Sequence, residues 1–122
     1  MARILLIEDS PTDAAVLSQL LQRNGHQVLT SGSAEDGIEV CKRELPDLVL
    51  MDVVMPNLNG FQATRSIAKD AKTSHIPIIL VTTKDQETDR VWGIRQGAKA
   101  YVTKPINEGE LVETIQKLLP AA

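Results

Sequence analysis

Hydrophobic and polar residues follow two distinct patterns along the chain. Short runs of consecutive apolar residues are separated by longer segments in which apolar residues recur every three or four positions. The first pattern is typical of strands buried on both faces, and the second is typical of amphipathic helices. The predicted strands are Arg3–Ile7, His26–Thr30, Asp47–Met51, Ile76–Thr82 and Ala100–Thr103. The second is the least apolar, so we expect it at an edge of the sheet.

Sequences that start helices follow each predicted strand. Ser10 can cap the first helix, with Pro11 at its first position and Asp13 in its first turn. The other helices are expected to start at Ser33, to run from about Asn59 to Asp70, to span Lys84–Gly97, and to start at Asn107. Pro46 and Pro120 are expected to end the second and the last helix.

Five strand–helix units with short connections predict an α/β fold. Strands that are apolar throughout indicate a parallel sheet, and right-handed crossovers then place helices on both of its faces. We therefore expect a doubly wound parallel sheet that forms one domain over residues 1–122, without an output domain.

Composition and charge narrow the function classes. The net charge of −3 and the pI near 5.3 argue against direct nucleic-acid binding, which favours a basic face. No apolar run approaches the roughly 20 residues that span a bilayer, and the N-terminal segment lacks the pattern of a signal peptide. With Cys41 as the only cysteine, no internal disulfide can form. We therefore expect a soluble, cytoplasmic protein that does not insert into membranes.

Ionisable or hydroxyl side chains lie at the ends of four of the five predicted strands. Glu8-Asp9 follows the first strand, Asp52 follows the third, Thr82 ends the fourth and Lys104 follows the fifth. Because the carboxyl ends of parallel strands meet at one edge, these groups are expected to lie close together. Three carboxylates against one ammonium leave two negative charges, which one divalent cation would cancel. Oxygen ligands of this kind suit Mg²⁺.

A carboxylate beside Mg²⁺ can act as a nucleophile toward phosphorus and form an aspartyl phosphate. Asp52 is the candidate because it follows a dense apolar run, where a lone carboxylate is costly. The alternative is that these acids only cap the helices that follow the strands. Ser10 already supplies a cap, and Asp52 does not stand before a helix start, so the anion and metal site is favoured.

The chain resembles response-regulator receiver domains over essentially its whole length. The shared features are, in chain order, Glu8-Asp9, Asp52, Met55-Pro56 followed by Gly60, Thr82, and Lys104-Pro105. Each is weak alone, but together they are highly specific. The resemblance implies the flavodoxin-like (βα)5 fold with strand order 2-1-3-4-5. The stretches "MPNLNGFQATR" and "VTTKDQETDRVWGIRQGA" are most similar to the single-domain regulators of type IV pilus twitching motility, a chemotaxis-type system.

The resemblance also implies a metal site. Asp52 would accept the phosphoryl group, and Mg²⁺ would be held by Asp9, by Asp52 and by the backbone carbonyl of Val54. Glu8 would act mostly through metal-bound water.

Further positions are carried over in the same way. Lys104 would pair with the phosphoryl group, Thr82 would be the switch hydroxyl, and Tyr101 the aromatic ring that moves inward with it. The bond before Pro105 is cis in the family.

The function that the resemblance implies is that of a phospho-accepting response regulator in a two-component phosphorelay. It would receive its phosphoryl group from a histidine kinase or a phosphotransfer domain. It would promote its own Mg²⁺-dependent phosphorylation and dephosphorylation without being an enzyme for a separate substrate. Its output would pass to a target protein through the face formed by the fourth helix, fifth strand and fifth helix. Trp92 in the fourth helix is either core or a partner contact. Twitching motility is the expected pathway.

The alternative functions come from several classes of protein. A flagellar chemotaxis-type regulator or a phosphate sink would use the same site, whereas an unphosphorylated pseudo-receiver would not need the complete set of site residues. A haloacid-dehalogenase-type phosphatase needs a second Asp where this chain has Val54, and more chain. A flavin carrier on the same fold needs a first loop that binds phosphate, but Glu8 and Asp9 would repel one.

Overall fold

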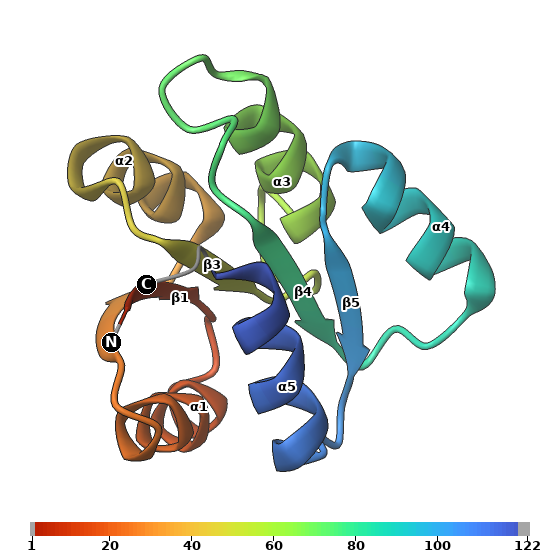
Figure 1. The fold of residues 1–122 in the computed structure, drawn as a ribbon. Coiled ribbons are helices and arrows are strands. Elements are labelled where there is room, and N and C mark those ends of the chain that lie inside the picture. The colour runs from red at the N-terminus through yellow and green to blue at the C-terminus, as the bar shows by residue number, and fades with distance from the viewer. Residues whose placement is uncertain (1, 120–122) are drawn as a thin grey trace.

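A parallel sheet of five strands forms the centre of the computed structural model, which describes residues 2–119 (Figure 1). Pro120, expected to end the last helix, lies outside these residues. The strand order is β2-β1-β3-β4-β5, as the resemblance implied. The strands are β1 Arg3–Ile7, β2 Gln27–Ser31, β3 Leu48–Met51, β4 Ile78–Thr82 and β5 Ala100–Thr103. The helices are α1 Pro11–Arg23, α2 Ala34–Glu44, α3 Gly60–Lys69, α4 Glu87–Gln96 and α5 Glu108–Leu118.

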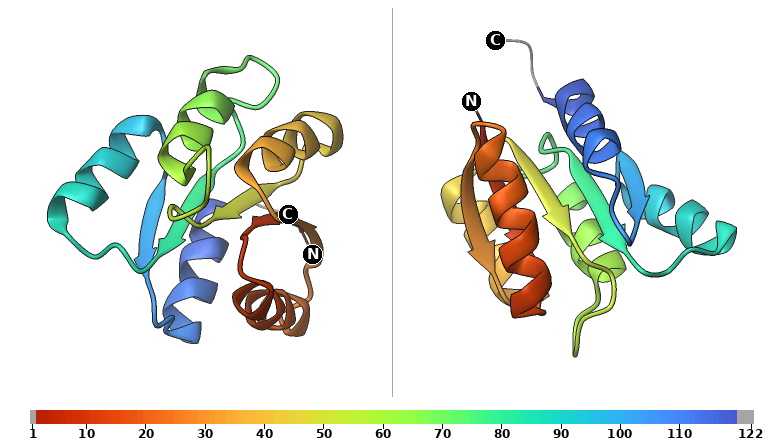
Figure 2. Two further views of the ribbon diagram at one scale, coloured as in Figure 1. Left: turned by 180° about the vertical axis from the view of Figure 1, so that it is seen from behind. Right: turned by 90° about the horizontal axis from the view of Figure 1, so that it is seen from below.

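Helices cover both faces of the sheet, with α1 and α5 on one face and α2, α3 and α4 on the other (Figures 1 and 2). Alternate residues of each strand point to opposite faces. In β1, Ile4 and Leu6 pack with α1 and α5, whereas Leu5 and Ile7 pack on the opposite side with α2 and α3. Both faces are therefore buried, which explains why the central strands are apolar throughout.

Most helices start where their capping residues predict. The side chains of Ser10, Ser33 and Asn107 each accept a hydrogen bond from the backbone N–H three residues later. Asn59 and Gln62 form a reciprocal capping box at the start of α3. At its other end α2 stops at Leu45, in the left-handed conformation, just before Pro46.

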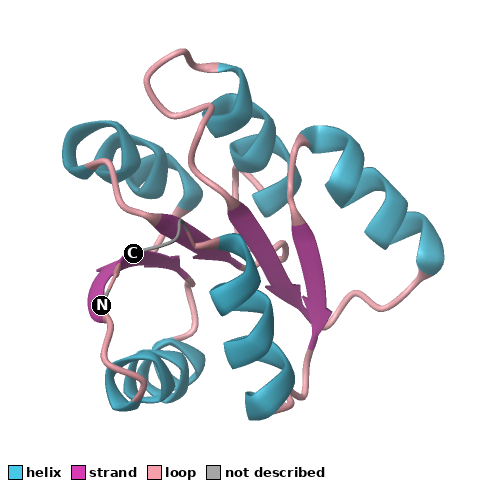
Figure 3. Ribbon diagram, viewed as in Figure 1, coloured by secondary structure: helices cyan, strands magenta, loops and turns pink. Residues whose placement is uncertain are grey.

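Two predicted elements begin two or more residues later in the structure than in the prediction. The fourth strand starts at Ile78 rather than Ile76, after Pro77, which has no N–H to donate to a ladder. The fourth helix starts at Glu87 rather than at Lys84, so the β4–α4 loop is longer than predicted; Figure 3 shows this loop. The second strand is shifted by one residue, and it does lie at an edge of the sheet.

Cys41 is fully buried in α2, and burial raises the pKa of its thiol to about 11. A buried thiol with a raised pKa is an apolar core group rather than a reactive nucleophile. Among the described residues, no helix has both the length and the apolar character needed to cross a bilayer.

Candidate functional site

The sheet ladder itself fixes the backbone of the residues at its carboxyl edge. Asp52 donates its backbone N–H to the carbonyl of Ile7 at 3.0 Å, and Glu8 donates to Ser31 at 3.0 Å. Lys104 likewise donates to the carbonyl of Thr82 at 2.8 Å. Glu8, Asp52 and Lys104 therefore stand one residue beyond three strands, as the sequence predicted, with little freedom to move along the sheet.

Three carboxylates lie close together at this edge. Glu8, Asp9 and Asp52 each present an oxygen atom within 4.8 Å of the others. Glu8 is 4% exposed and Asp52 is 8% exposed, whereas Asp9 faces solvent. A cluster of hard oxygen ligands, partly buried but open on the Asp9 side, fits Mg²⁺, which retains some of its water molecules when bound. The donor set contains no sulfur or nitrogen, so it does not favour a soft metal.

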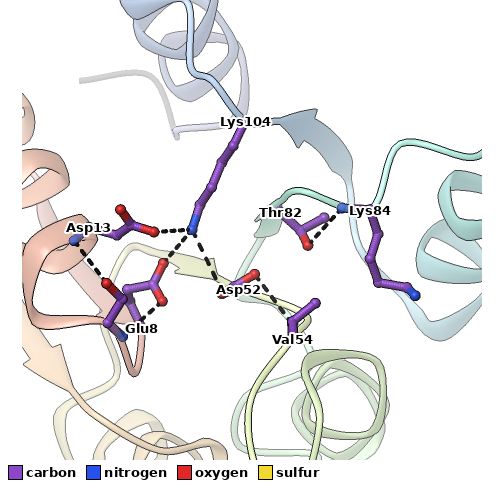
Figure 4. Close-up of polar contacts among 8 residues, drawn as sticks. Glu8, Asp13, Asp52, Val54, Thr82, Lys84 and Lys104 are labelled. Atoms are coloured by element: carbon purple, nitrogen blue, oxygen red, sulfur yellow. Dashed lines mark hydrogen bonds and ion pairs between the residues drawn. The ribbon is translucent and has the colours of Figure 1, made fainter.

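Lys104 reaches into the cluster from the end of β5 (Figure 4). Its Nζ lies 2.8 Å from Oε1 of Glu8 and 2.8 Å from Oδ2 of Asp13, but 3.7 Å from Oδ2 of Asp52. The first two distances are hydrogen bonds, and the third is an ion pair without one. The ammonium is thus held on the Glu8 side of the site rather than on the carboxylate of Asp52.

Burial and charge shift the pKa of two groups at this edge. Burial raises the pKa of Glu8, and the hydrogen bonds from Lys104 and from the Ser10 backbone offset only part of that rise. Burial alone would lower the pKa of Lys104, but its hydrogen bonds to Asp13 and Glu8 and the charge of Asp52 raise it instead. Lys104 is therefore firmly protonated at neutral pH and supplies a permanent positive charge.

Asp13 is the member of this cluster that the sequence prediction missed. The prediction placed it in the first turn of α1 as a helix-stabilising acid, where it does lie. That turn follows the Glu8-Asp9 loop directly, so its side chains can point back to the edge of the sheet. The spacing was a usable signal, but the contact with Lys104 also depends on how the β5–α5 loop lies beside α1.

The loop after Asp52 folds back tightly on the strand. The backbone N–H of Val54 donates to Oδ1 of Asp52 at 3.3 Å, and that of Gly60 donates to the carbonyl of Val53 at 3.0 Å. A Cβ atom at position 60 would overlap the carbonyl oxygen of Asp52, so only glycine fits. The side chain of Val54 is 55% exposed beside the site.

Thr82 and Tyr101 are both connected to Lys84. The hydroxyl oxygen of Thr82, which is fully buried, accepts from the backbone N–H of Lys84 at 3.3 Å. The hydroxyl of Tyr101 donates to the carbonyl of Lys84 at 2.7 Å, and the ring is already buried. On its outer side the guanidinium of Arg90 lies 5.5 Å from the ring centroid, a cation–π distance.

The capping alternative for the acids is wrong. Glu8 and Asp52 do accept backbone N–H groups, from Ser10 and Val54, but neither is the residue that caps a helix. That residue is Ser10 for α1 and Asn59 for α3. The bond between Lys104 and Pro105, next to the site, is cis.

Comparisons with known proteins agree with this geometry. The family model of the response regulator receiver domain matches residues 4–116. The protein PilH of Pseudomonas aeruginosa is 58% identical over 119 residues, which cover 98% of this chain and 98% of PilH. The transcriptional regulatory protein AfsQ1 of Streptomyces coelicolor is 38% identical over 98% of this chain, which spans 52% of AfsQ1.

Solved structures give the same picture. The chemotaxis protein CheY4 of Vibrio cholerae superposes with a TM-score of 0.91 at 27% identity, covering 98% of this chain and 99% of the other. The receiver domain of a sensor histidine kinase from Pseudomonas aeruginosa has a TM-score of 0.89 at 30% identity, with 96% of both chains covered. That structure contains a magnesium ion coordinated in its active-site cleft.

Proposed function

The chain belongs to the response regulator receiver domain family, and on that premise we propose that it is a phospho-accepting response regulator with Asp52 as its acceptor. Receiver domains act as phosphoacceptors and signalling modules rather than as enzymes for a separate substrate. The observation that carries the proposal is the position of Asp52. This carboxylate directly follows the central strand β3, next to two further carboxylates and 3.7 Å from an ammonium.

The proposed reaction is transfer of a phosphoryl group from a phosphohistidine of a kinase or phosphotransfer domain. An Oδ atom of Asp52 attacks phosphorus, the P–N bond breaks, and its electron pair stays on the imidazole nitrogen. The phosphoryl oxygens then carry the negative charge, which Lys104 Nζ would pair with. The hydroxyl of Thr82, on the neighbouring strand β4, would donate a further hydrogen bond.

Glu8, Asp9 and Asp52 would hold a Mg²⁺ ion, together with the backbone carbonyl of Val54. When bound, the ion neutralises negative charge on the phosphoryl oxygens and the carboxylates. The two buried carboxylates differ in role in this proposal. Asp52 is the nucleophile, whereas Glu8 acts through water molecules of the ion and through its ion pair with Lys104.

The signal would leave through the α4–β5–α5 face. Phosphorylation adds about one negative charge beside Thr82. A movement of the Thr82 hydroxyl toward the phosphoryl group would break its bond to Lys84, whose carbonyl holds Tyr101. The side chains of Val91, Trp92 and Ile94 on α4 are 44%, 50% and 46% exposed, and exposed apolar residues of this kind suit a protein contact. Trp92 is thus a candidate partner contact rather than core.

We propose twitching motility as the pathway and the cytoplasm as the location. The proposal is supported by the 58% identity to PilH over nearly the full length of both chains, against 27% to the chemotaxis protein CheY4. We propose further that residues 1–122 form a single receiver domain, whose partners are a histidine kinase or phosphotransfer domain and a target protein.

One experiment tests the acceptor. The protein is incubated with Mg²⁺ and a small phosphodonor, or with beryllofluoride, while intact mass and Trp92 fluorescence are followed. We expect one added phosphoryl group and a fluorescence change, both abolished by Asp52→Ala and by Asp52→Asn. Asp85→Asn, which removes an exposed acid from the loop at the same edge, should behave as the wild type. Labelling that survives both Asp52 variants would overturn the proposal.

A further inference from the structure

Asp13 reaches the site from α1, and its backbone is fixed there. The N–H of Asp13 donates to Oγ of Ser10 at 3.3 Å, and Pro11 occupies the first helical position. Its Oδ2 atom lies 2.8 Å from Nζ of Lys104, a residue 91 positions away. The carboxylate is therefore presented to Lys104 by the helix start rather than by chance contact of two flexible side chains.

The three acids around Lys104 do not share it equally. Glu8 and Asp13 both accept hydrogen bonds at 2.8 Å, while Asp52 remains at 3.7 Å (Figure 4). The Lys104 side chain is only 13% exposed, so few water molecules can compete for it. To pair with a phosphoryl group on Asp52, the ammonium must give up at least part of its contact with the other two carboxylates.

Of those two carboxylates, only Glu8 belongs to the acidic cluster that can hold a metal ion; Asp13 does not. The carboxylate of Asp13 caps no backbone group and is 45% exposed, so among the described residues its one specific partner is Lys104. We propose that Asp13 is a positioning residue that restrains Lys104 away from Asp52 in the unphosphorylated protein and so opposes the phosphorylated state. The proposal rests on the proposed function, because it assumes that Asp52 is the acceptor.

Removing the contact between Asp13 and Lys104 should favour binding of a phosphoryl group or its mimic at Asp52. In Asp13→Asn, we expect beryllofluoride to bind about three- to tenfold more tightly at saturating Mg²⁺, as one charged hydrogen bond to Lys104 no longer competes. Binding of Mg²⁺ alone should not tighten, because one negative charge near the cation is lost. Asp13→Glu retains the carboxylate and should bind beryllofluoride nearly as the wild type does. Isothermal titration calorimetry measures both affinities.

A purely electrostatic or structural role of Asp13 predicts different results. Glu35→Gln removes an acid from the first turn of α2, and it should leave beryllofluoride affinity unchanged. The decisive comparison repeats Asp13→Asn in a Lys104→Gln background. If Asp13 acts through Lys104, the tightening disappears there; if its charge acts through space, the tightening persists.

The outcomes separate this inference from the proposed function. Unchanged or weaker beryllofluoride binding in folded Asp13→Asn would overturn the inference, and so would tightening that persists in the Lys104→Gln background. Asp13→Ser, which also lacks the charge, serves if Asp13→Asn does not fold, with thermal unfolding as the check. A wild-type protein that binds no beryllofluoride would instead remove the proposed function, and the inference with it.

Discussion

Among single residues, Tyr101 is held at its hydroxyl, at its ring and at its backbone carbonyl. Its hydroxyl donates to Lys84, its ring is buried, and Arg90 covers the ring and donates to the Tyr101 carbonyl at 3.4 Å. Burial, with the charge of Asp89, raises the pKa of the phenol to about 12. The ring thus lies in the interior, where its hydroxyl is bonded to the carbonyl of Lys84.

The raised pKa gives Tyr101 a measurable effect on alkaline stability. Below pH 10 the phenol is neutral in both the folded and the unfolded chain, so its contribution to stability is fully present. As the pH rises from 10 toward about 12 the unfolded chain ionises first, and that contribution is lost. Tyr101→Phe should cost about 1 kcal/mol at pH 7, from the unpaired Lys84 carbonyl. Its free energy of unfolding should then fall less steeply above pH 10. Parallel curves for the two proteins in urea titrations would contradict this.

Single residues also show why the site was only partly predictable. Glu8, Asp52 and Lys104 were predictable because the rule that strand ends meet at one edge needs only the sequence pattern. Asp13 was not, because its contact with Lys104 depends on the position of the β5–α5 loop beside α1. Lys104 lies 2.8 Å from Glu8 and Asp13 but 3.7 Å from Asp52, and no sequence pattern encodes a difference of this size.

At the scale of elements, capping residues predict helix starts well except where the loop residues form other hydrogen bonds. The expected start of the fourth helix at Lys84 is wrong because the backbone N–H and carbonyl of Lys84 bond to Thr82 and Tyr101. Those two groups are then not available to a helix. The helix begins instead after Gln86, without a side-chain cap. The β4–α4 loop is thus shaped by the proposed switch residues.

The start of α3 depends on one glycine. Gly60→Ala should destabilise the protein by about 1–3 kcal/mol, because the new Cβ would push the Asp52 carbonyl and the Asp52–Gly60 loop apart. Mg²⁺ affinity should fall as well, since the same loop carries Asp52. Gly32→Ala is the matched control: a Cβ there meets nothing within 4 Å, so little change is expected. Urea unfolding with and without Mg²⁺ measures both effects; equal losses in the two variants would disprove the argument.

At the scale of the whole molecule, the fold concentrates negative charge at one edge of the sheet. Glu8, Asp9 and Asp52 meet within 4.8 Å, and Lys104 is the one cation among the described residues that ion-pairs with Glu8 and Asp52. Close like charges destabilise the folded state unless a cation binds them. The stability of the protein should therefore depend on divalent ions.

Magnesium removal tests that dependence. At a Mg²⁺ concentration of about 100 times Kd, the free energy of unfolding should exceed the value in chelator by about 2.7 kcal/mol. Asp9→Asn should raise the stability of the metal-free protein, because one of three like charges is gone, and should lose most of the gain from Mg²⁺. Glu110→Gln, an exposed acid in the first turn of α5, should keep the full gain. A gain of equal size in Asp9→Asn would rule out Asp9 as a ligand.

The ion pair between Glu8 and Lys104 joins residues 96 positions apart, and Asp52 lies between them in the chain. The set is complete only when the first, third and fifth strands are all in the sheet, because Glu8 follows the first strand, Asp52 the third and Lys104 the fifth. We therefore expect a phosphoryl donor to label fully folded molecules and to leave partly folded ones unlabelled.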